Sequence, residues 1–142
     1  MRASQRGATL IEFALVLLVF LTFLLGIIDF SRMLFTWNAA TEATRLGARY
    51  AVVCDDTYQQ AAVLAKMQQL LPQISAVSVQ WSPAGCTAST CEGVTVGISG
   101  LQYQWISPIA GLAGPSLAMP SFSTYLPREV MRQDPNSNSI CS

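Results

Sequence analysis

The sequence predicts an α+β fold, in which one long N-terminal helix packs on a small antiparallel β-sheet together with a second short helix. The first half of the long helix is expected to span a membrane, and the second half to form a spine for the outer domain. Three observations predict this: a long apolar run near the N-terminus, no helix breaker beyond it before Val53 except Gly47, and an apolar spacing of two after Pro72. Charged residues make up 11% of the 142-residue chain, well below the ~25% of soluble domains, so part of the chain is expected to lie in lipid.

The apolar run covers residues 8–28 and reads ATLIEFALVLLVFLTFLLGII. Its 21 residues would form a helix about 31 Å long, which matches the hydrocarbon thickness of a bilayer. Arg2 and Arg6 precede the run, so the positive-inside rule places the N-terminus in the cytoplasm. The opposite charges of Asp29 and Arg32 after the run cancel, so the charge difference between its two ends is small. A cleaved secretory signal is disfavoured, because bulky residues follow the run without a small-x-small cleavage pattern.

Glu12 is the one ionisable side chain inside this run. A carboxylate in a spanning helix costs roughly 2.5–3.5 kcal/mol near the bilayer centre and less near an interface, so such residues are usually functional and paired. If the chain is cut between Gly7 and Ala8, Ala8 carries a new amino group and Glu12 becomes the fifth residue of the mature chain. The two charges do not easily meet within one straight helix, but the amine of one subunit can pair with Glu12 of a neighbour.

Residues 6–13, RGATLIEF, resemble the type IV prepilin signature of a short basic leader, a glycine, four further residues, a glutamate and an apolar helix. The longer stretch 6–53 resembles the TadE family of the tight-adherence (Flp) pilus system, including the segment NAATEATRLGARYA at 38–51. Many type IV pilins have Phe where this chain has Ala8, and a small residue there is more typical of TadE-like and Flp-like proteins.

This resemblance implies a pilin-like fold and a minor pilin or pseudopilin that is needed for pilus assembly. It implies cleavage after Gly7 by a prepilin peptidase, often with methylation of the new N-terminus. The implied partners are that peptidase, the major Flp-type pilin and other TadE-like or TadG-like minor pilins. The expected organisation is a leader at 1–7, a transmembrane helix at 8–28, a helical spine at 29–53 and a periplasmic α+β domain at 54–142 of a single-pass inner-membrane protein.

Polar side chains recur along the predicted spine at helical spacing. Asn38, Glu42, Arg45 and Arg49 form one stripe, in which Glu42 and Arg45 are spaced to form an ion pair. The stripe is read either as a solvated face or, through Arg45 and Arg49, as a contact face for another pilin or an assembly protein. A second face ends in small residues, where another element can approach the backbone closely: Met33, Trp37, Ala40, Thr44, Gly47 and Ala51.

The outer domain is expected to begin with a short helix. Thr57 and Gln60 fit a capping box, and Pro72 ends the helix. Its core face is expected to comprise Val63, Leu64, Met67, Leu70 and Leu71.

Strands are expected around Val77–Trp81, Val94–Ile98 and Leu101–Trp105, with a bend near Gly100 where the apolar alternation changes parity. The stretch 106–120 is predicted to be loop with at most one helical turn. Residues 121–126 are predicted to add an edge strand, and 127–132 a short helical end.

Four cysteines follow the apolar run, as expected for disulfides in an oxidising compartment. A zinc site is the alternative, but the chain has no His and two of the cysteines are isolated. Four cysteines allow three pairings, which the sequence does not decide. We favour Cys86–Cys91, which would staple a hairpin, and Cys54–Cys141, which would tie down the C-terminal tail.

Enzymatic function is disfavoured, because the chain has no His, no Gly-rich phosphate loop and no paired carboxylates in an apolar setting. No catalytic residue, cofactor, metal or small-molecule substrate is expected. No basic block is present either, so no nucleic-acid partner is expected. The alternative to a pilus component is an uncleaved, single-pass, membrane-anchored periplasmic binding module.

Overall fold

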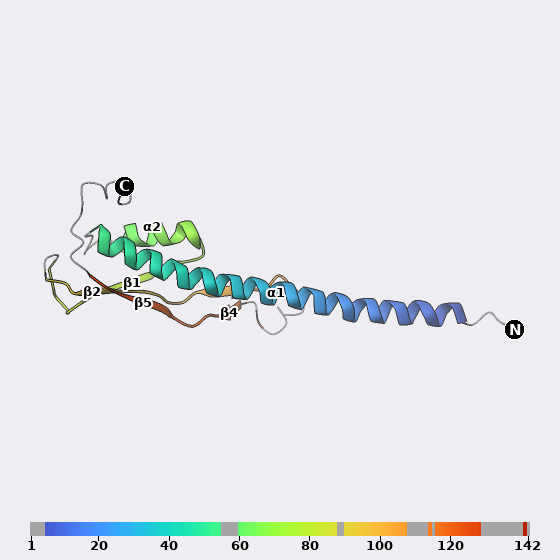
Figure 1. Ribbon diagram of the computed structural model, residues 1–142. Coiled ribbons are helices and arrows are strands. Elements are labelled where there is room, and N and C mark those ends of the chain that lie inside the picture. Colours follow the sequence, from blue (N-terminus) through green and yellow to red (C-terminus); the bar gives the residue numbers. More distant parts are fainter. Residues whose placement is uncertain are drawn as a thin grey trace. The chain divides into compact units, whose positions relative to one another are not determined.

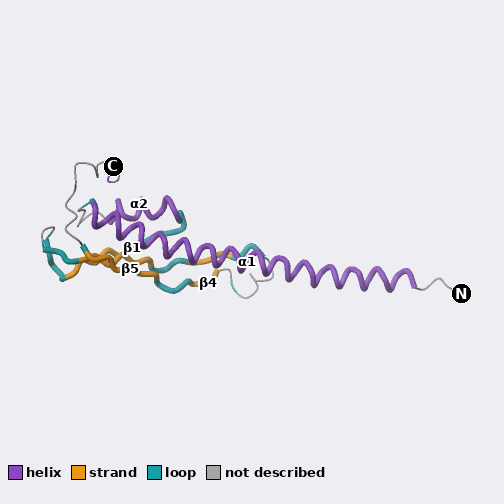
Figure 2. Tube along the Cα trace, in the orientation of Figure 1, coloured by secondary structure: helices purple, strands orange, loops and turns teal. Residues whose placement is uncertain are grey.

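The structure is a computed structural model that describes residues 5–54, 60–87, 90–107, 114, 116–128 and 141, with side chains from residue 7 onward. Among the described residues, two helices precede five strands along the chain, and Figures 1 and 2 show the helices beside the strands. The predicted α+β class, with a long N-terminal helix, a second short helix and an antiparallel sheet, is confirmed. The elements are α1 (Gln5–Val53), α2 (Gln60–Leu70), β1 (Val77–Ser82), β2 (Gly93–Ile98), β3 (Gln102–Gln104), β4 (Ser116–Ala118) and β5 (Phe122–Pro127).

Helix α1 continues without interruption for 49 residues and ends at Val53, as predicted. No proline lies within it, so every turn can keep its backbone hydrogen bonds. The hydroxyls of Thr22 and Ser31 donate to carbonyl oxygens one turn earlier, at 2.8 Å in each case. These bonds satisfy polar groups within the helix itself, which suits an apolar surrounding.

The chain divides into two compact units, and both contain part of α1. The first unit comprises residues 1–34 and 104–117, and the second comprises 35–103 and 118–142. In the first unit, the backbone N–H groups of Ile106 and Ser107 donate to the carboxylate of Asp29 on α1. A segment distant in sequence is thereby fastened to the first part of the helix.

The second unit contains a three-stranded antiparallel sheet in the order β1-β2-β5. Val96 in the central strand lies opposite Val79 in β1 and Thr124 in β5, so these three residues share one face of the sheet. The Thr44 hydroxyl of α1 lies 2.7 Å from the Thr124 hydroxyl, which shows that this face meets α1. The core of the unit therefore lies between the sheet and the helices.

Small residues in the second part of α1 allow close packing of α2. Ala40, Ala43 and Ala51 are fully buried. A Cβ placed on Gly47 would lie 2.6 Å from Met67 Sδ and 3.2 Å from Val63 Cγ1, so a larger residue there would displace the Met67 side chain and crowd α2. The predicted close approach at the small-residue face is thus present.

The hairpin, the bend and the edge strand also agree with the predictions. Strands β1 and β2 pair antiparallel, Gly100 adopts a positive φ of 72° between β2 and β3, and β5 pairs with β2 at one edge of the sheet. Gly100 is suited to this bend because it has no Cβ to clash in the left-handed region.

Three details of the predictions were wrong. Residues 116–118 form strand β4, which pairs with β3 in a two-stranded sheet, instead of belonging to a loop. Strand β3 ends at Gln104, before Trp105. Leu70 is 47% exposed because it lies away from the buried Val63–Met67 face of α2. The capping box at Thr57 and most of the helical end predicted at 127–132 fall outside the described residues.

Candidate functional site

The first half of α1 exposes an almost continuous apolar surface. Its most hydrophobic 18-residue window has a mean hydropathy of 2.8 and is 0% buried by the rest of the chain. Leu10 and Phe23 are each 70% exposed. Among the described residues, α1 is the one helix that is long and apolar enough to cross a membrane, and an N-terminal signal sequence would satisfy the same criterion. Within the described residues nothing covers this surface, which favours a membrane or another protein as its partner.

Glu12 lies on this exposed apolar surface. Within the described part of the chain its carboxylate makes no hydrogen bond or ion pair. Gly7 and Ala8 lie one turn earlier in α1 and are exposed, and no atom lies within 4 Å of a Cβ placed on Gly7. The residues assigned to cleavage and to subunit pairing are therefore all accessible on one helical segment.

Asp29 differs from Glu12, because it is buried and hydrogen-bonded. The residue is only 2% exposed, and its Oδ1 accepts from the Ile106 N–H at 3.0 Å while its Oδ2 accepts from the Ser107 N–H at 2.9 Å. The Arg32 guanidinium lies 3.9 Å from Oδ1 and adds a weaker attraction. Two charge-assisted hydrogen bonds offset the cost of burying this carboxylate.

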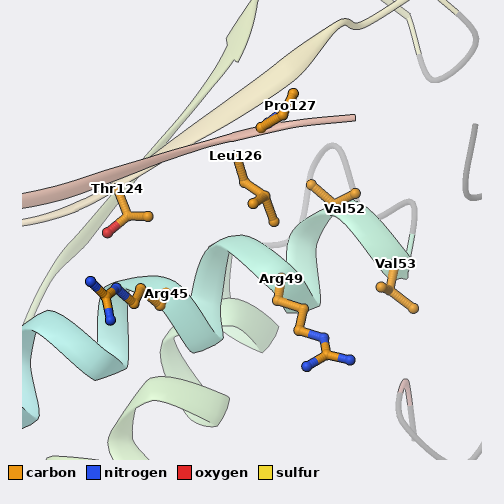
Figure 3. A pocket seen from close by; sticks show the side chains of 7 residues that line it. All are labelled: Arg45, Arg49, Val52, Val53, Thr124, Leu126 and Pro127. Atoms are coloured by element: carbon orange, nitrogen blue, oxygen red, sulfur yellow. The ribbon is translucent and has the colours of Figure 1, made fainter. Parts of the chain in front are cut away.

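Arg45 and Arg49 line a shallow groove in the second unit. The groove has a volume of about 550 Å³ and is mostly apolar, with Leu126 pointing from β5 toward α1 (Figure 3). The structure thus brings the two predicted contact residues together with part of the sheet. The residues that line the groove are Arg45, Arg49, Val52, Val53, Thr124, Leu126 and Pro127.

The charges at this groove are only partly compensated. Arg45 forms the expected ion pair with Glu42 at 2.8 Å, but both side chains are more than half exposed, so the pair adds only a few tenths of a kcal/mol to stability. Arg49 has no ion pair within the described residues. Among the residues that the structure describes, the Arg49 charge therefore has no ion-pair partner beside this apolar surface.

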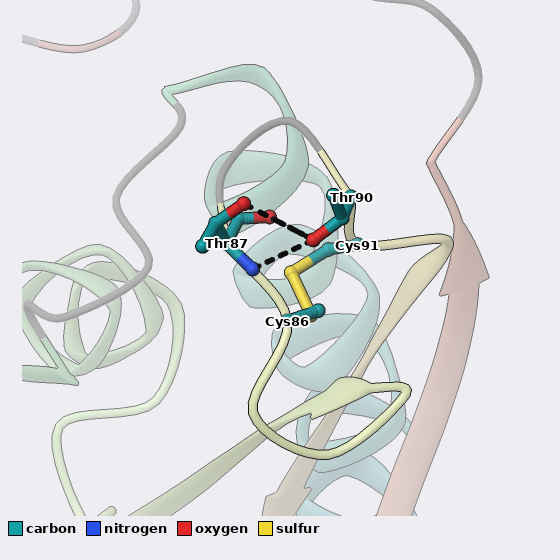
Figure 4. The surroundings of a disulfide bond; sticks show 4 residues. All are labelled: Cys86, Thr87, Thr90 and Cys91. Atoms are coloured by element: carbon teal, nitrogen blue, oxygen red, sulfur yellow. Dashed lines mark hydrogen bonds between the residues drawn. A yellow bond between two sulfur atoms is a disulfide. The ribbon is translucent and has the colours of Figure 1, made fainter.

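Both favoured disulfides are present in the structure. Cys86 and Cys91 close the tip of the β1–β2 hairpin, where the Thr87 N–H also donates to the Thr90 hydroxyl at 2.8 Å (Figure 4). Cys54, just after α1, is bonded to Cys141 across 87 residues of sequence. All four sulfurs are bonded, and the described residues include no group of three His, Cys, Asp or Glu side chains suited to a metal ion.

Sequence reasoning missed two features of these sites. It treated Asp29 only as one of two opposed charges after the apolar run, whereas the structure makes it the attachment point for residues 106 and 107. It also gave no indication that Thr124 and Leu126 lie beside the two arginines. A single acidic residue placed directly after an apolar run was the available signal for Asp29.

Comparison with protein-family models gives a match over residues 7–49 to the family described as TadE-like protein. The chain has no match among curated proteins or solved structures. The matched residues include Glu12, Asp29 and both arginines of the groove. The resemblance seen in the sequence is therefore confirmed, and the segment that forms nearly all of α1 is a TadE-like segment.

Proposed function

We propose that this protein is a minor pilin or pseudopilin required for assembly of a tight-adherence (Flp-type) pilus. Its function is structural and not enzymatic. The TadE-like match and the apolar N-terminal helix support association with a Tad pilus. In this proposal, α1 anchors the protein in the inner membrane and packs among the helices of other pilin-like subunits.

The observation that carries the proposal is Glu12, which has no ion-pair or hydrogen-bond partner among the described residues and lies on an otherwise apolar, exposed helix surface. In lipid, an isolated carboxylate is unfavourable, so it requires a partner of opposite charge. Cleavage after Gly7 by a prepilin peptidase would create such a partner, the α-amino group of Ala8. Pairing between Glu12 of one subunit and Ala8 of the next would neutralise both charges and set the axial offset between the helices.

The proposed topology places the N-terminus in the cytoplasm and residues 54–142 in the periplasm. The two disulfides support this orientation, because disulfides persist in oxidising compartments and are rare in the cytosol. The leader, membrane helix, spine and outer domain would then correspond to residues 1–7, 8–28, 29–53 and 54–142. The mature protein would then act either in the membrane complex that initiates the pilus or as a subunit of the pilus itself.

The first test is the mass of the mature protein, extracted from membranes of cells with and without a prepilin peptidase. We expect loss of Met1–Gly7 only where the peptidase is present. An intact N-terminus in cells that contain an active peptidase would contradict the proposal. It would favour the alternative, an uncleaved membrane-anchored periplasmic binding module, for which the exposed groove beside β5 is the available binding surface.

We propose further that the Arg45–Arg49 groove binds an acidic, extended segment of a neighbouring pilin-like subunit. Among the described strands, β5 pairs only with β2, so its second edge can accept another strand. The positive charge of Arg49 and the apolar side chain of Leu126 suit a segment that carries both an acidic and an apolar residue.

The groove is tested by replacing Arg49 in two ways. Arg49→Glu reverses the charge, whereas Arg49→Lys retains it with a similar length. We expect Arg49→Glu to reduce co-purification of partner pilins several-fold and Arg49→Lys to retain most of it. Equal recovery of partners with both variants would show that Arg49 is only a solvated residue on the helix surface.

A further inference from the structure

The short segment 105–107 is held against α1 at the level where the apolar run ends. Asp29 is the first charged residue after residues 8–28, and both of its carboxylate oxygens accept hydrogen bonds from the backbone of this segment, at 3.0 Å and 2.9 Å. Because the bonds join backbone groups to a buried side chain, they fix the position of the segment along the helix. If residues 8–28 span a bilayer, the segment must lie at the boundary of the hydrocarbon core.

The side chains that this segment presents are apolar and incompletely covered. Ile106 is 58% exposed, and Phe30, the residue after Asp29 on α1, is 56% exposed. Trp105 is half-buried and lines a groove of about 300 Å³ with Phe30 and Gly26. Leaving such surface in water costs about 25 cal/mol per Å², so an apolar phase nearby would be favoured.

We propose that Trp105 and Ile106 form a second membrane contact, which inserts into the outer boundary of the bilayer beside the transmembrane helix. The inference rests on the proposed membrane anchoring of α1. The partner is the lipid interface, where acyl chains meet headgroups. Tryptophan is enriched at that depth because its ring is largely apolar while its N–H can reach water or headgroups.

A lipid surface fits this patch better than a neighbouring protein subunit for two reasons. The exposed surface of Phe30 follows that of residues 8–28 along α1 with only the buried Asp29 between them, and the next charge, Arg32, lies beside Asp29, where a long guanidinium side chain can reach the headgroups. The attachment of residues 105–107 also lies at one defined level, directly after the span, as a contact with a planar interface requires. The Asp29 carboxylate is thus a positioning group that sets how deeply α1 enters the membrane.

The test uses tryptophan fluorescence of the full chain in phosphatidylcholine vesicles whose acyl chains carry bromine, which quenches nearby indoles. A variant with Trp37→Phe and Trp81→Phe retains only Trp105. Trp81→Phe removes a buried indole N–H that lacks a hydrogen-bond partner in the described chain, so this change is expected to be tolerated. Trp37→Phe retains an aromatic ring against Phe122, whose centroid lies 5.1 Å away.

The matched control retains only Trp37, through Trp81→Phe and Trp105→Phe. Trp37 lies eight residues beyond Asp29 on α1, about 12 Å further along the helix, and is expected to lie outside the hydrocarbon core. We expect brominated lipid to quench Trp105 several-fold more strongly than Trp37. Adding Asp29→Ala to the Trp105 variant should release the segment and reduce its quenching toward that of Trp37.

Three outcomes against the proposal are distinguishable. If the protein floats with the vesicles but Trp105 is quenched no more than Trp37, the second contact is wrong while the membrane anchor stands. If the protein does not float with the vesicles, both the anchor and the contact are wrong. A Trp105 emission that shifts only when a second pilin-like subunit is added would likewise overturn the lipid assignment, because it would identify the patch as a protein interface.

Discussion

The two halves of α1 are equally helical but have opposite surfaces. From residue 8 to 28 the side chains are mostly large and exposed, as for Leu10 and Phe23 at 70% each. From residue 35 onward the face toward the rest of the chain is made mostly of small residues, and Ala40 and Ala43 are fully buried. Large apolar side chains without a partner in the chain require an outside phase, whereas small ones admit the chain's own elements.

This difference suggests that the first half of α1 serves membrane insertion and association with other subunits, whereas the second half serves folding of the chain itself. The first half contributes an unpaired carboxylate and an uncovered apolar surface, so its substitutions should affect insertion and assembly. The second half contributes close contacts with α2 and β5, so its substitutions should affect the free energy of unfolding. Matched substitutions in the two halves therefore test whether the division is real.

The largest expected effect is that of Glu12→Ala. Membrane insertion should be unchanged or improved, because a charge is removed from the span, while pilus assembly and co-purification with partner pilins should be lost. Glu42→Ala is the control, since Glu42 is an exposed carboxylate in the second half whose partner among the described residues is Arg45 at the surface. Normal pilus number with Glu12→Ala, counted by electron microscopy, would refute the pairing role.

The next effect concerns the two disulfides. In the loop-entropy description, a bond that closes 87 residues of sequence, as Cys54–Cys141 does, stabilises by about 4–5 kcal/mol, and one that closes 5 residues, as Cys86–Cys91 does, by about 2 kcal/mol. Replacing both cysteines of the long bridge by serine should therefore lower the urea midpoint of unfolding more than the same change in the short bridge. The reverse order would show that the C-terminal tail contributes little to the stability of the second unit.

A smaller effect is expected from Gly47→Leu, with Gly26→Leu as its counterpart in the first half. At Gly47 the new side chain would collide with Met67 and Val63, and overpacking of this kind costs about 1–3 kcal/mol. At Gly26 nothing lies within 4 Å of the added Cβ, so the free energy of unfolding in detergent should not fall. Equal destabilisation by the two variants would contradict the division of α1.

The packing of the second half of α1 and the β1–β2 hairpin could be predicted from the sequence, whereas strand β4 could not. The small residues around Gly47 indicated close packing, and the alternating residues from Val77 indicated a hairpin, because both patterns are local and follow the periodicity of the element. Strand β4 was missed because three residues, Ser116–Ala118, are too short to show an alternation, and their pairing with β3 depends on tertiary contacts.

The candidate sites were predictable only where one residue type is unusual in its surroundings. Glu12 was identified because a carboxylate in an apolar run is costly whatever it contacts. The role of Asp29 depends on backbone groups 77 and 78 residues away, and no local pattern encodes that distance. The groove itself was not predicted: the spacing of Arg45 and Arg49 placed them on one stripe, while their proximity to Leu126 required the packing of β5.

The smallest expected effect is the difference in unfolding free energy between valine substitutions at two threonines of α1, Thr44 and Thr22. The Thr44 hydroxyl is buried and lies 2.7 Å from both the Thr41 carbonyl oxygen and the Thr124 hydroxyl, so Thr44→Val should leave Thr124 without its partner and cost about 1 kcal/mol. Within the described part of the chain, the Thr22 hydroxyl donates to the Leu18 carbonyl of its own helix alone, so Thr22→Val should be neutral in urea unfolding and slightly favour membrane insertion. If Thr22→Val instead destabilised the fold as much as Thr44→Val, the first half of α1 would have to be covered by the chain itself, and its exposed apolar surface would no longer require lipid or a neighbouring subunit.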